Sequence, residues 1–501
     1  MKGARRGRMT IVNSGRMRRL CLPSCVAISL LALAGCSFAP EHVRPAMPVP
    51  DQYALTAAHD SSVASLGWRD YFRDASLQAL VDEALANNRD IRIASARVAE
   101  ARASWRIEGA ALYPELNAVG TGTRGRTLFN LPTVGATPVD VRQISAQLSA
   151  SWEIDFWGRL RNLRDAARWQ YLATEEARRA VATDLIAQVA NGYLLEREYE
   201  ERSALARQSI STREEALRIL RRRYEVGSGS KLDMTQAQTL LAQAETVLQS
   251  LEQDRDINRN ALALLVGQPV DIAPGPLGMA AIEPHVAIPA GLPSELLTNR
   301  PDIVGAEYRL RAAGANIGAA RAAFMPNISL TGAYGTMSDK LDGLFSGGSE
   351  AWSFSPTISL PLFNAGRLKG NLDVARARQE LAVAEYEQAI QRAFRDVSDA
   401  LVRRRQLALQ IDTTARLLDA QRERARLAQL RFDNGRSAYL EVLDAQRDLF
   451  EAEQGLVQLR RAEMASAVTL YSALGGGFPA GPNVDDSSGQ GRPVQDDGGQ
   501  R

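Results

Sequence analysis

The sequence contains one pattern twice, and this repetition restricts the fold more than any other feature. The motif around Gly158, FWGRL, recurs around Gly366 as FNAGRL, and the motif ending at Gly227, RYEVG, recurs at Gly435 as RFDNG. Both pairs of glycines are 208 positions apart (366 − 158 and 435 − 227). Because two distant motifs keep one spacing, the chain is predicted to be a duplicated structural unit.

Residues 1–35 are predicted to be a signal peptide. Seven basic residues between Lys2 and Arg19 precede a short apolar run, Leu20–Ala34, which is the order found in secretory signals. The run ends in LAGC, which resembles a bacterial lipobox, so Cys36 is predicted to receive lipid and to begin the mature chain. Ordinary cleavage near an A-x-A site is the alternative.

Export changes what the composition means. Cys21 and Cys25 leave with the signal, so the mature chain keeps only Cys36 and must be held together by packing or oligomerisation. The signal also removes seven of the 60 Lys and Arg residues, which leaves 60 − 7 = 53 against 58 Asp and Glu. The net charge of the mature chain is therefore 53 − 58 = −5, and nothing in it supports nucleic-acid binding.

Composition divides the mature chain into segments. Residues 36–66, with four prolines, are predicted to be an extended lipidated tether. Residues 267–293, with six prolines, are predicted to link the two copies, and residues 475–501, which are almost without apolar side chains, to be disordered. The two repeats are then expected over 67–266 and 294–474.

Each copy is predicted to contain an antiparallel pair of long helices. Residues 159–226 and 367–434 contain no proline and one glycine each, so each could extend about 100 Å as a helix. Both end at a glycine, as helices often do, and returning helices are predicted over 232–265 and 440–474. One apolar stripe on the second long helix is expected to pack in the core: Tyr386, Ile390, Phe394, Val397 and Leu401.

Two strands are predicted in each copy before its long helix. Residues 144–154 alternate apolar and polar side chains over about eleven residues, the length of a membrane-spanning strand. A weaker partner begins at Leu116, and the second copy alternates in the same way over 328–334 and 352–362. The segments between the strands are rich in Gly, Asp, Ser, Thr and Pro and are predicted to be loops: 124–141 and 337–350.

Four strands alone cannot form a membrane channel. Aromatic residues at the strand ends favour a membrane location over the alternative, edge strands of a soluble sheet. Four strands cannot close a barrel, and an open sheet edge cannot face lipid, so two or three chains must contribute eight or twelve strands. The predicted fold is an internally duplicated α+β membrane protein that forms a conduit continued by a helical tube.

Several motifs carry a family resemblance over roughly residues 66–474. They are SWEIDFWGRLR at 151–161, GLPSELL at 291–297, RPDI at 300–303, IGAAR at 317–321, FMP at 324–326 and LPLF at 360–363. In these motifs the chain closely resembles the outer-membrane factors of tripartite efflux pumps, the TolC-like channels, and within them the NodT-type outer-membrane efflux lipoproteins.

The resemblance implies a homotrimer whose twelve-stranded β-barrel spans the outer membrane and continues as a periplasmic α-helical barrel. Such a protein is the outer-membrane channel of a tripartite, RND-type efflux system and a passive exit duct for drugs or other small toxic compounds. The implied partners are a periplasmic adaptor protein, an inner-membrane RND-type transporter and outer-membrane lipid. No cofactor or metal is implied, and the sequence does not identify the cargo.

The resemblance also implies a periplasmic gate in the second hairpin. Leu440, Asp444 and Arg447 are spaced i, i+4 and i+7, so they share one face of a helix. By resemblance, Leu440 is a steric plug, Asp444 forms an acidic ring, and Arg431 and Arg447 are its charged partners. Phe432 belongs to the same group but stands where the family usually has a tyrosine, which puts a hydroxyl contact in doubt.

The alternative to a gate is an ordinary i,i+3 surface pair between Asp444 and Arg447, worth a few tenths of a kcal/mol. The first copy has Gln236 and Thr239 at the equivalent positions. Because the two copies differ there, the gate is expected in the second copy.

The two hairpin turns are predicted to dock the adaptor, again by resemblance. They present Gly227 and Ser228 in the first copy and Gly435 and Arg436 in the second. Simple reversal of the helix, which glycine explains by itself, is the alternative, and the two roles are compatible.

An enzyme is not predicted. His42, His59 and His285 are isolated in loop-like segments, so neither a metal cluster nor a catalytic triad is visible. The competing class is a lipid-anchored structural coiled coil of the envelope. Conductance in planar bilayers separates the two classes, since a structural protein conducts no ions.

Overall fold

The computed structural model describes residues 37–50, 52–53, 67–131, 135–273, 275 and 296–476. The predicted signal peptide, Cys36 and the tail beyond residue 476 lie outside the described residues, as does most of the predicted linker 267–293. Within the described part of the chain, no helix combines the length and the apolar character needed to cross a membrane.

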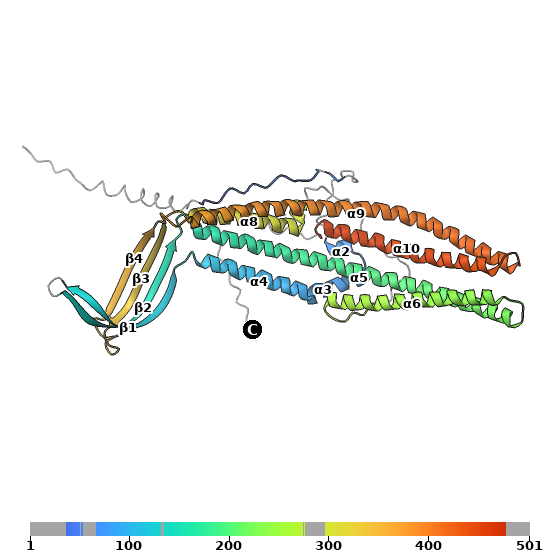
Figure 1. Cartoon of the computed structure of the whole chain (residues 1–501), viewed down its shortest axis with the longest axis horizontal. Coiled ribbons are helices and arrows are strands. Elements are labelled where there is room, and N and C mark those ends of the chain that lie inside the picture. The colour runs from blue at the N-terminus through green and yellow to red at the C-terminus, as the bar shows by residue number, and fades with distance from the viewer. Residues whose placement is uncertain are drawn as a thin grey trace, which may run out of the picture. The chain divides into compact units, whose positions relative to one another are not determined.

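Both copies place two strands after their first helices and follow them with two long helices, and among the described residues the first copy has one helix more before its strands. The first copy contains α2 (Trp68–Tyr71), α3 (Ala75–Asn87), α4 (Arg89–Ala110), β1 (Glu115–Leu131), β2 (Gly135–Ile154), α5 (Arg159–Glu225) and α6 (Lys231–Val266). The second contains α7 (Leu296–Asn299), α8 (Pro301–Ala322), β3 (Asn327–Ser338), β4 (Glu350–Ser359), α9 (Arg367–Asp433) and α10 (Tyr439–Ala473). Figure 1 shows α6 lying along α5 and α10 lying along α9.

The two predicted helical hairpins are confirmed. Helices α5 and α9 each contain 67 residues and begin directly after Gly158 and Gly366. These glycines have positive φ values of 76° and 85°, a conformation that glycine adopts without steric cost. The same backbone turn therefore starts both long helices, as the repeated motif predicts.

Polar side chains hold the start of α5 in place. The Asp155 carboxylate accepts hydrogen bonds from the backbone N–H groups of Leu160, at 3.0 Å, and Arg161, at 2.8 Å. The Arg159 guanidinium binds both oxygens of Glu153, each at 2.8 Å. The Asp155 contacts satisfy N–H groups that have no partner inside the helix, and the Arg159–Glu153 ion pair ties the helix start to β2, so the sequence EIDFWGRLR both ends β2 and begins α5.

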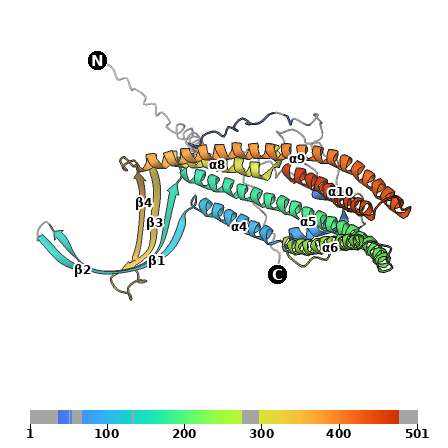
Figure 2. The ribbon, with the colours of Figure 1, turned by 45° about the vertical axis from the view of Figure 1, so that its right-hand side comes forward.

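The four strands form one antiparallel sheet in the order β1-β2-β3-β4. Figure 2 shows the strands side by side, with β1 and β2 extending beyond β3 and β4. The sheet leaves β1 and β4 as its two edges.

The prediction of a loop over 124–141 is wrong. Strand β1 continues to Leu131 and β2 begins at Gly135, with paired residues from Arg124 opposite Arg142 to Leu131 opposite Gly135. Main-chain hydrogen bonds between β1 and β2 stabilise this extension of the two strands. Glycine and polar residues are therefore tolerated there, because neither face of this part of the hairpin needs apolar side chains. The loop predicted over 337–350 is nearly confirmed, since β3 ends at Ser338 and β4 begins at Glu350.

One face of the sheet is apolar and exposed. Leu148 lies opposite Tyr334, which lies opposite Trp352, so the three side chains form one row across the strands. They are 62%, 61% and 77% exposed. These exposed fractions leave the row open among the described residues, and an open apolar row of this kind suits contact with lipid or with another chain.

The chain forms two compact units, each with its own packing. One lies within residues 1–44, 101–171 and 309–382 and contains the sheet. The other lies within 45–100, 172–308 and 383–501 and contains the main core. In that core the rings of Tyr71 and Tyr471 stack at 4.6 Å between centroids. The predicted stripe on α9 is confirmed: Tyr386, Ile390 and Val397 are buried there, and Phe394 and Leu401 pack against them.

Candidate functional site

The two hairpin turns have the same hydrogen-bonded geometry. In the first, Ser228 N–H donates to the Arg223 carbonyl at 2.8 Å and Gly227 N–H donates to the Tyr224 carbonyl at 3.0 Å. In the second, the corresponding bonds run from Arg436 to Arg431 and from Gly435 to Phe432, both at 2.9 Å. This is the Schellman pattern, which needs the positive φ found at Gly227 (78°) and Gly435 (68°).

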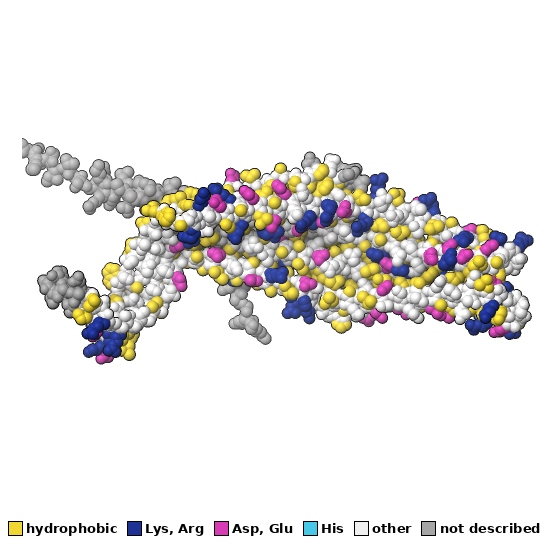
Figure 3. All heavy atoms as spheres, viewed as in Figure 1, with side chains coloured by type: hydrophobic (Ala, Val, Ile, Leu, Met, Phe, Trp, Pro, Cys, Tyr) yellow, Lys and Arg dark blue, Asp and Glu magenta, His cyan; other side chains and the backbone are white. Residues whose placement is uncertain are grey.

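The turns expose the side chains that were predicted to dock the adaptor. A Cβ atom added to Gly227 or Gly435 would meet nothing within 4 Å. Ser228 and Arg436 are exposed beside them. Figure 3 shows charged side chains of both signs gathered around the hairpin turns.

A small apolar cluster joins the two hairpins near their turns. Its members from the first hairpin are Leu217, Leu220 and Ala237, and those from the second are Ala428, Tyr439, Val442, Leu443 and Ala445. Phe432 packs against this cluster, with its ring 4.8 Å from the Tyr439 ring and 5.1 Å from the Arg223 guanidinium. Phe432 thus acts through ring contacts, without the hydroxyl of a tyrosine.

Two of the predicted gate residues are in contact. The Arg447 guanidinium lies 3.3 Å from Asp444 and 3.1 Å from Asp448, all on α10. Asp448 also pairs with Arg424 on α9. The Arg424 hydrogen bond, followed by Arg447, lowers the pKa of the Asp448 carboxyl, and the Asp448 hydrogen bond raises the pKa of Arg447. This charged cluster links the two helices of the second hairpin.

The other two gate residues lie apart from this cluster. Arg431 pairs with Glu441 at 3.1 Å, so its acidic partner within the chain is not Asp444. Leu440 is 45% exposed next to the turn, in keeping with a side chain that meets something outside the chain. Within one chain, the Asp444–Arg447 contact has the i,i+3 form that the surface-pair alternative predicts.

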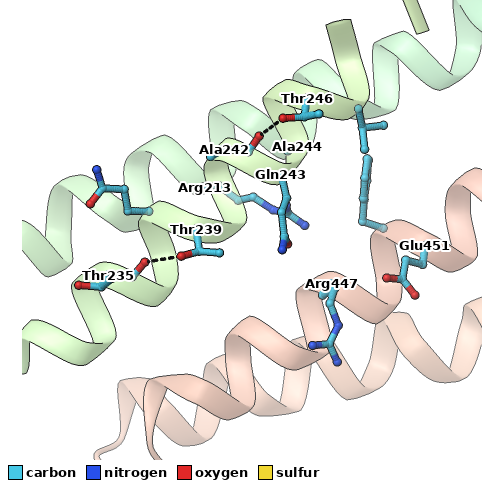
Figure 4. Close-up of a pocket in the computed structure, with 12 residues that line it drawn as sticks. Arg213, Thr235, Thr239, Ala242, Gln243, Ala244, Thr246, Arg447 and Glu451 are labelled. Carbon is cyan, nitrogen blue, oxygen red and sulfur yellow. Dashed lines mark hydrogen bonds between the residues drawn. The ribbon is translucent and has the colours of Figure 1, made fainter. Parts of the chain in front are cut away.

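A groove of about 850 Å³ lies between α6 and α10 (Figure 4). Its lining comes from α5, α6 and α10: Arg213, Thr235, Gln238, Thr239, Ala242, Gln243, Ala244, Thr246, Val247, Arg447, Phe450 and Glu451. Thr239 and Arg447, which occupy equivalent positions in the two copies, line the same groove. The groove was not predicted from the sequence.

Sequence reasoning also missed Asp448, Arg424 and Glu441. Asp448 directly follows Arg447, so a charged neighbour was visible in the sequence. Its contact with Arg424 joins residues 24 positions apart on two helices, and the periodicity of a single helix carries no signal for such a contact.

Paired strands that leave free edges, joined to two long helical hairpins, define a duplicated channel-forming protein of the cell envelope. The sequence profile of the outer membrane efflux protein family matches residues 80–268 and again 292–476. The chain belongs to this family.

Relatives with known roles and structures agree with this assignment. The chain is 42% identical over 467 residues to the solvent efflux pump outer membrane protein SrpC of Pseudomonas putida, covering 91% of this chain and 98% of SrpC. It is 41% identical over 461 residues to the cation efflux system protein CusC of Escherichia coli, again covering 91% and 98%. The open-state crystal structure of the Neisseria gonorrhoeae MtrE outer membrane channel matches with a TM-score of 0.80 and 37% identity, covering 88% of this chain and 98% of MtrE.

These likenesses confirm the predicted fold class, the efflux function and the outer-membrane location. The protein is the outer-membrane channel component of an efflux system, in a family of channels and not of enzymes.

Proposed function

We propose that three copies of the chain assemble into a passive exit duct. The observation that carries this proposal is the sheet, which leaves the outer edges of β1 and β4 without a partner strand among the described residues and exposes an apolar row. An open edge is unfavourable in lipid, and three chains pairing β1 with β4 of a neighbour would satisfy every edge with twelve strands. Conductance of the purified protein in planar bilayers tests the duct. Absence of conductance would favour the alternative class, a lipid-anchored structural coiled coil.

The periplasmic end of the duct is closed at the second hairpin. Leu440 narrows the entrance, Asp444 forms the acidic ring, and Arg431 and Arg447 tie that ring to neighbouring side chains, with Phe432 packed behind them. Support comes from the exposure of Leu440 and from the Asp444–Arg447 pair, which is too exposed to add much to folding stability.

The turns at Gly227, Ser228, Gly435 and Arg436 receive a periplasmic adaptor, which couples the duct to an inner-membrane RND-type transporter. Support comes from the two identical Schellman turns, which present the same backbone surface twice per chain and six times per trimer. Crosslinking from cysteines placed at Ser228 and Arg436, followed by identification of the captured proteins, tests this coupling. Capture of no envelope protein in cells with an active pump would count against it.

Lipid on Cys36 anchors the chain to the outer membrane. Support comes from the residues that follow Cys36, which pack on the unit that contains the sheet. Ser37 Oγ donates to Asn162 Oδ1 at 3.1 Å, and Arg321 donates to the Phe38 carbonyl at 3.0 Å. Ser37 and Phe38 of the proposed tether 36–66 are therefore docked on this unit. Palmitate labelling of the wild type but not of Cys36→Ser tests the anchor.

The cargo consists of drugs or other small toxic compounds that the transporter delivers. Support comes from relatives whose names describe cation and solvent efflux on the same architecture. Deletion of the gene is expected to raise sensitivity to the pump's compounds, and restoring the gene is expected to reverse this. Unchanged sensitivity with an intact pump would overturn the efflux role in that cell.

A further inference from the structure

The groove between α6 and α10 contains a buried arginine that has no acidic partner among the described residues. Arg213 extends from α5 and is only 4% exposed. One guanidinium N–H donates to the Leu240 carbonyl at 2.5 Å, and the guanidinium lies 5.3 Å from the centre of the Phe450 ring. Neither contact supplies a full negative charge, and the remaining N–H donors have no hydrogen-bond partner in the part of the chain that the structure describes.

A charge in this position is poorly explained by packing alone. Burial lowers the pKa of Arg213 from its usual value, because desolvation disfavours the charged form. An apolar side chain of similar length would fill the same space without that cost. The free donors of Arg213 therefore point to an anion that completes the site.

The walls of the groove suit an apolar body. Ala242, Val247 and Phe450 contribute hydrocarbon surface. Thr239 and Thr246 donate their hydroxyls to carbonyls of their own helix, at 2.9 and 2.8 Å, as the dashed lines in Figure 4 show. Because these hydroxyl protons are bonded within the helix, the contribution of the two threonines to the groove lining is mainly their methyl groups. A volume of about 850 Å³ falls in the range of small-ligand sites.

The other charged groups of the groove do not satisfy Arg213. Arg447 is already paired with Asp444 and Asp448. Glu451 lines the groove but lies beyond ion-pair distance of Arg213. Figure 4 labels Arg213 and Gln243 among the residues that line the groove, so the lining offers an amide as well as the guanidinium.

We propose that this groove binds an amphiphilic organic carboxylate. The carboxylate accepts hydrogen bonds from the free N–H groups of Arg213, a pairing that the planar guanidinium makes with two parallel bonds. The apolar part of the ligand lies against Phe450 and the threonine methyl groups. Arg447 of the proposed gate lines one wall of this groove, but the anion-binding group is Arg213, which has no part in the gate. Arg213 also lies away from the docking turn, because it precedes Gly227 by 14 residues, about 20 Å of helix.

Isothermal titration of the full-length trimer in amphipol tests the proposal with three probes. 2-Naphthoate carries both features, 2-naphthamide lacks the charge, and acetate lacks the apolar body. Naphthoate is expected to bind at least about tenfold more tightly than either other probe. Equal affinity for naphthoate and naphthamide, or no naphthoate binding at millimolar concentration, would overturn the proposal.

Variants locate the binding at Arg213. Arg213→Met is expected to lose at least about tenfold in naphthoate affinity and Arg213→Lys to lose less, since it keeps the charge. Arg218→Met is the matched control, because Arg218 lies on the same helix, pairs with Glu215 and does not line the groove. Unchanged affinity in Arg213→Met would place the ligand elsewhere and reject the site. If Arg213→Met fails to fold, the comparison of the three probes on the wild type and Arg213→Lys still decides.

Discussion

Glu198 on α5 accepts a 2.8 Å hydrogen bond from Arg461 on α10, and this ion pair joins the two hairpins. The Glu198 side chain is only 4% exposed, and Arg202 is its second cationic partner, also at 2.8 Å. Arg202 in turn hydrogen-bonds the Gln454 side chain on α10. A buried carboxylate with two guanidinium partners therefore connects residues 263 positions apart.

Removal of one partner should weaken this connection. Arg461→Ala leaves the buried Glu198 carboxylate with Arg202 as its remaining cationic partner. The free energy of unfolding should fall by about 1.5 kcal/mol. This is the lower end of the range for hydrogen bonds to charged groups, because Arg461 is partly exposed. Thermal unfolding followed by circular dichroism measures the effect. Arg218→Ala is the control, since its pair with Glu215 is exposed and should contribute little. Equal melting temperatures for the two variants would contradict the assignment.

The proposed steric plug predicts a leak when its side chain is shortened. Leu440→Ala should raise the conductance of the closed trimer in planar bilayers, because the constriction loses three carbon atoms from each of three chains. Leu232→Ala is a matched control: Leu232 is the equivalent leucine of the first hairpin and is also exposed. A similar rise in conductance in both variants would show that either substitution loosens the hairpins, and it would contradict a specific role of Leu440 as the plug.

The proposed acidic ring predicts a second change at the same entrance. Asp444→Ala removes one carboxylate per chain from the entrance and leaves Arg447 without one of its partners. The entrance of the trimer then loses three negative charges, so closure should weaken and selectivity for cations should fall. The reversal potential in a salt gradient measures selectivity. Gln236→Ala at the equivalent position of the first hairpin should leave it unchanged. A reversal potential of Asp444→Ala equal to that of the wild type would show that Asp444 does not line the pore.

The fold was largely predictable from the sequence, because duplication and periodicity are local signals. Gly158 and Gly366 adopt the same positive-φ turn, and the long helices end within one residue of their predicted limits. The outer halves of β1 and β2 were missed because pairing between strands stabilises them. Thr123 opposite Gln143 and Thr127 opposite Val139 extend the ladder through residues whose composition resembles a loop.

The candidate site was less predictable, because its contacts run between helices. Spacing on one helix predicted the Asp444–Arg447 pair but not the bond from Arg424 to Asp448. The contact of Arg213 with Leu240 and Phe450 depends on how three helices pack, and no periodicity encodes that packing. Buried charge becomes visible only when the partners on neighbouring helices are known.

The second hairpin turn offers a test of adaptor docking. Arg436→Glu reverses an exposed charge without touching the apolar cluster, so adaptor binding should weaken about tenfold or more while the melting temperature stays constant. Arg416→Glu, on the exposed face of α9 well before the turn, is the control. Surface plasmon resonance with the cognate adaptor measures both. Equal adaptor affinities for Arg436→Glu and Arg416→Glu would show that the adaptor does not dock at this turn.

The charged link between α9 and α10 should depend on pH. The Arg424 hydrogen bond holds the pKa of the Asp448 carboxyl below its usual range, so the folded state favours the charged form. A lowered folded pKa adds stability above the unfolded value of about 4, and this contribution is lost as the pH falls through the folded pKa. Other carboxylates titrate in the same range, so the useful quantity is the difference in melting temperature between the wild type and Asp448→Asn. That difference should be constant from pH 7 to about pH 5 and should shrink toward pH 3. A difference that does not change with pH would show that the Asp448 charge adds no stability to the hairpin.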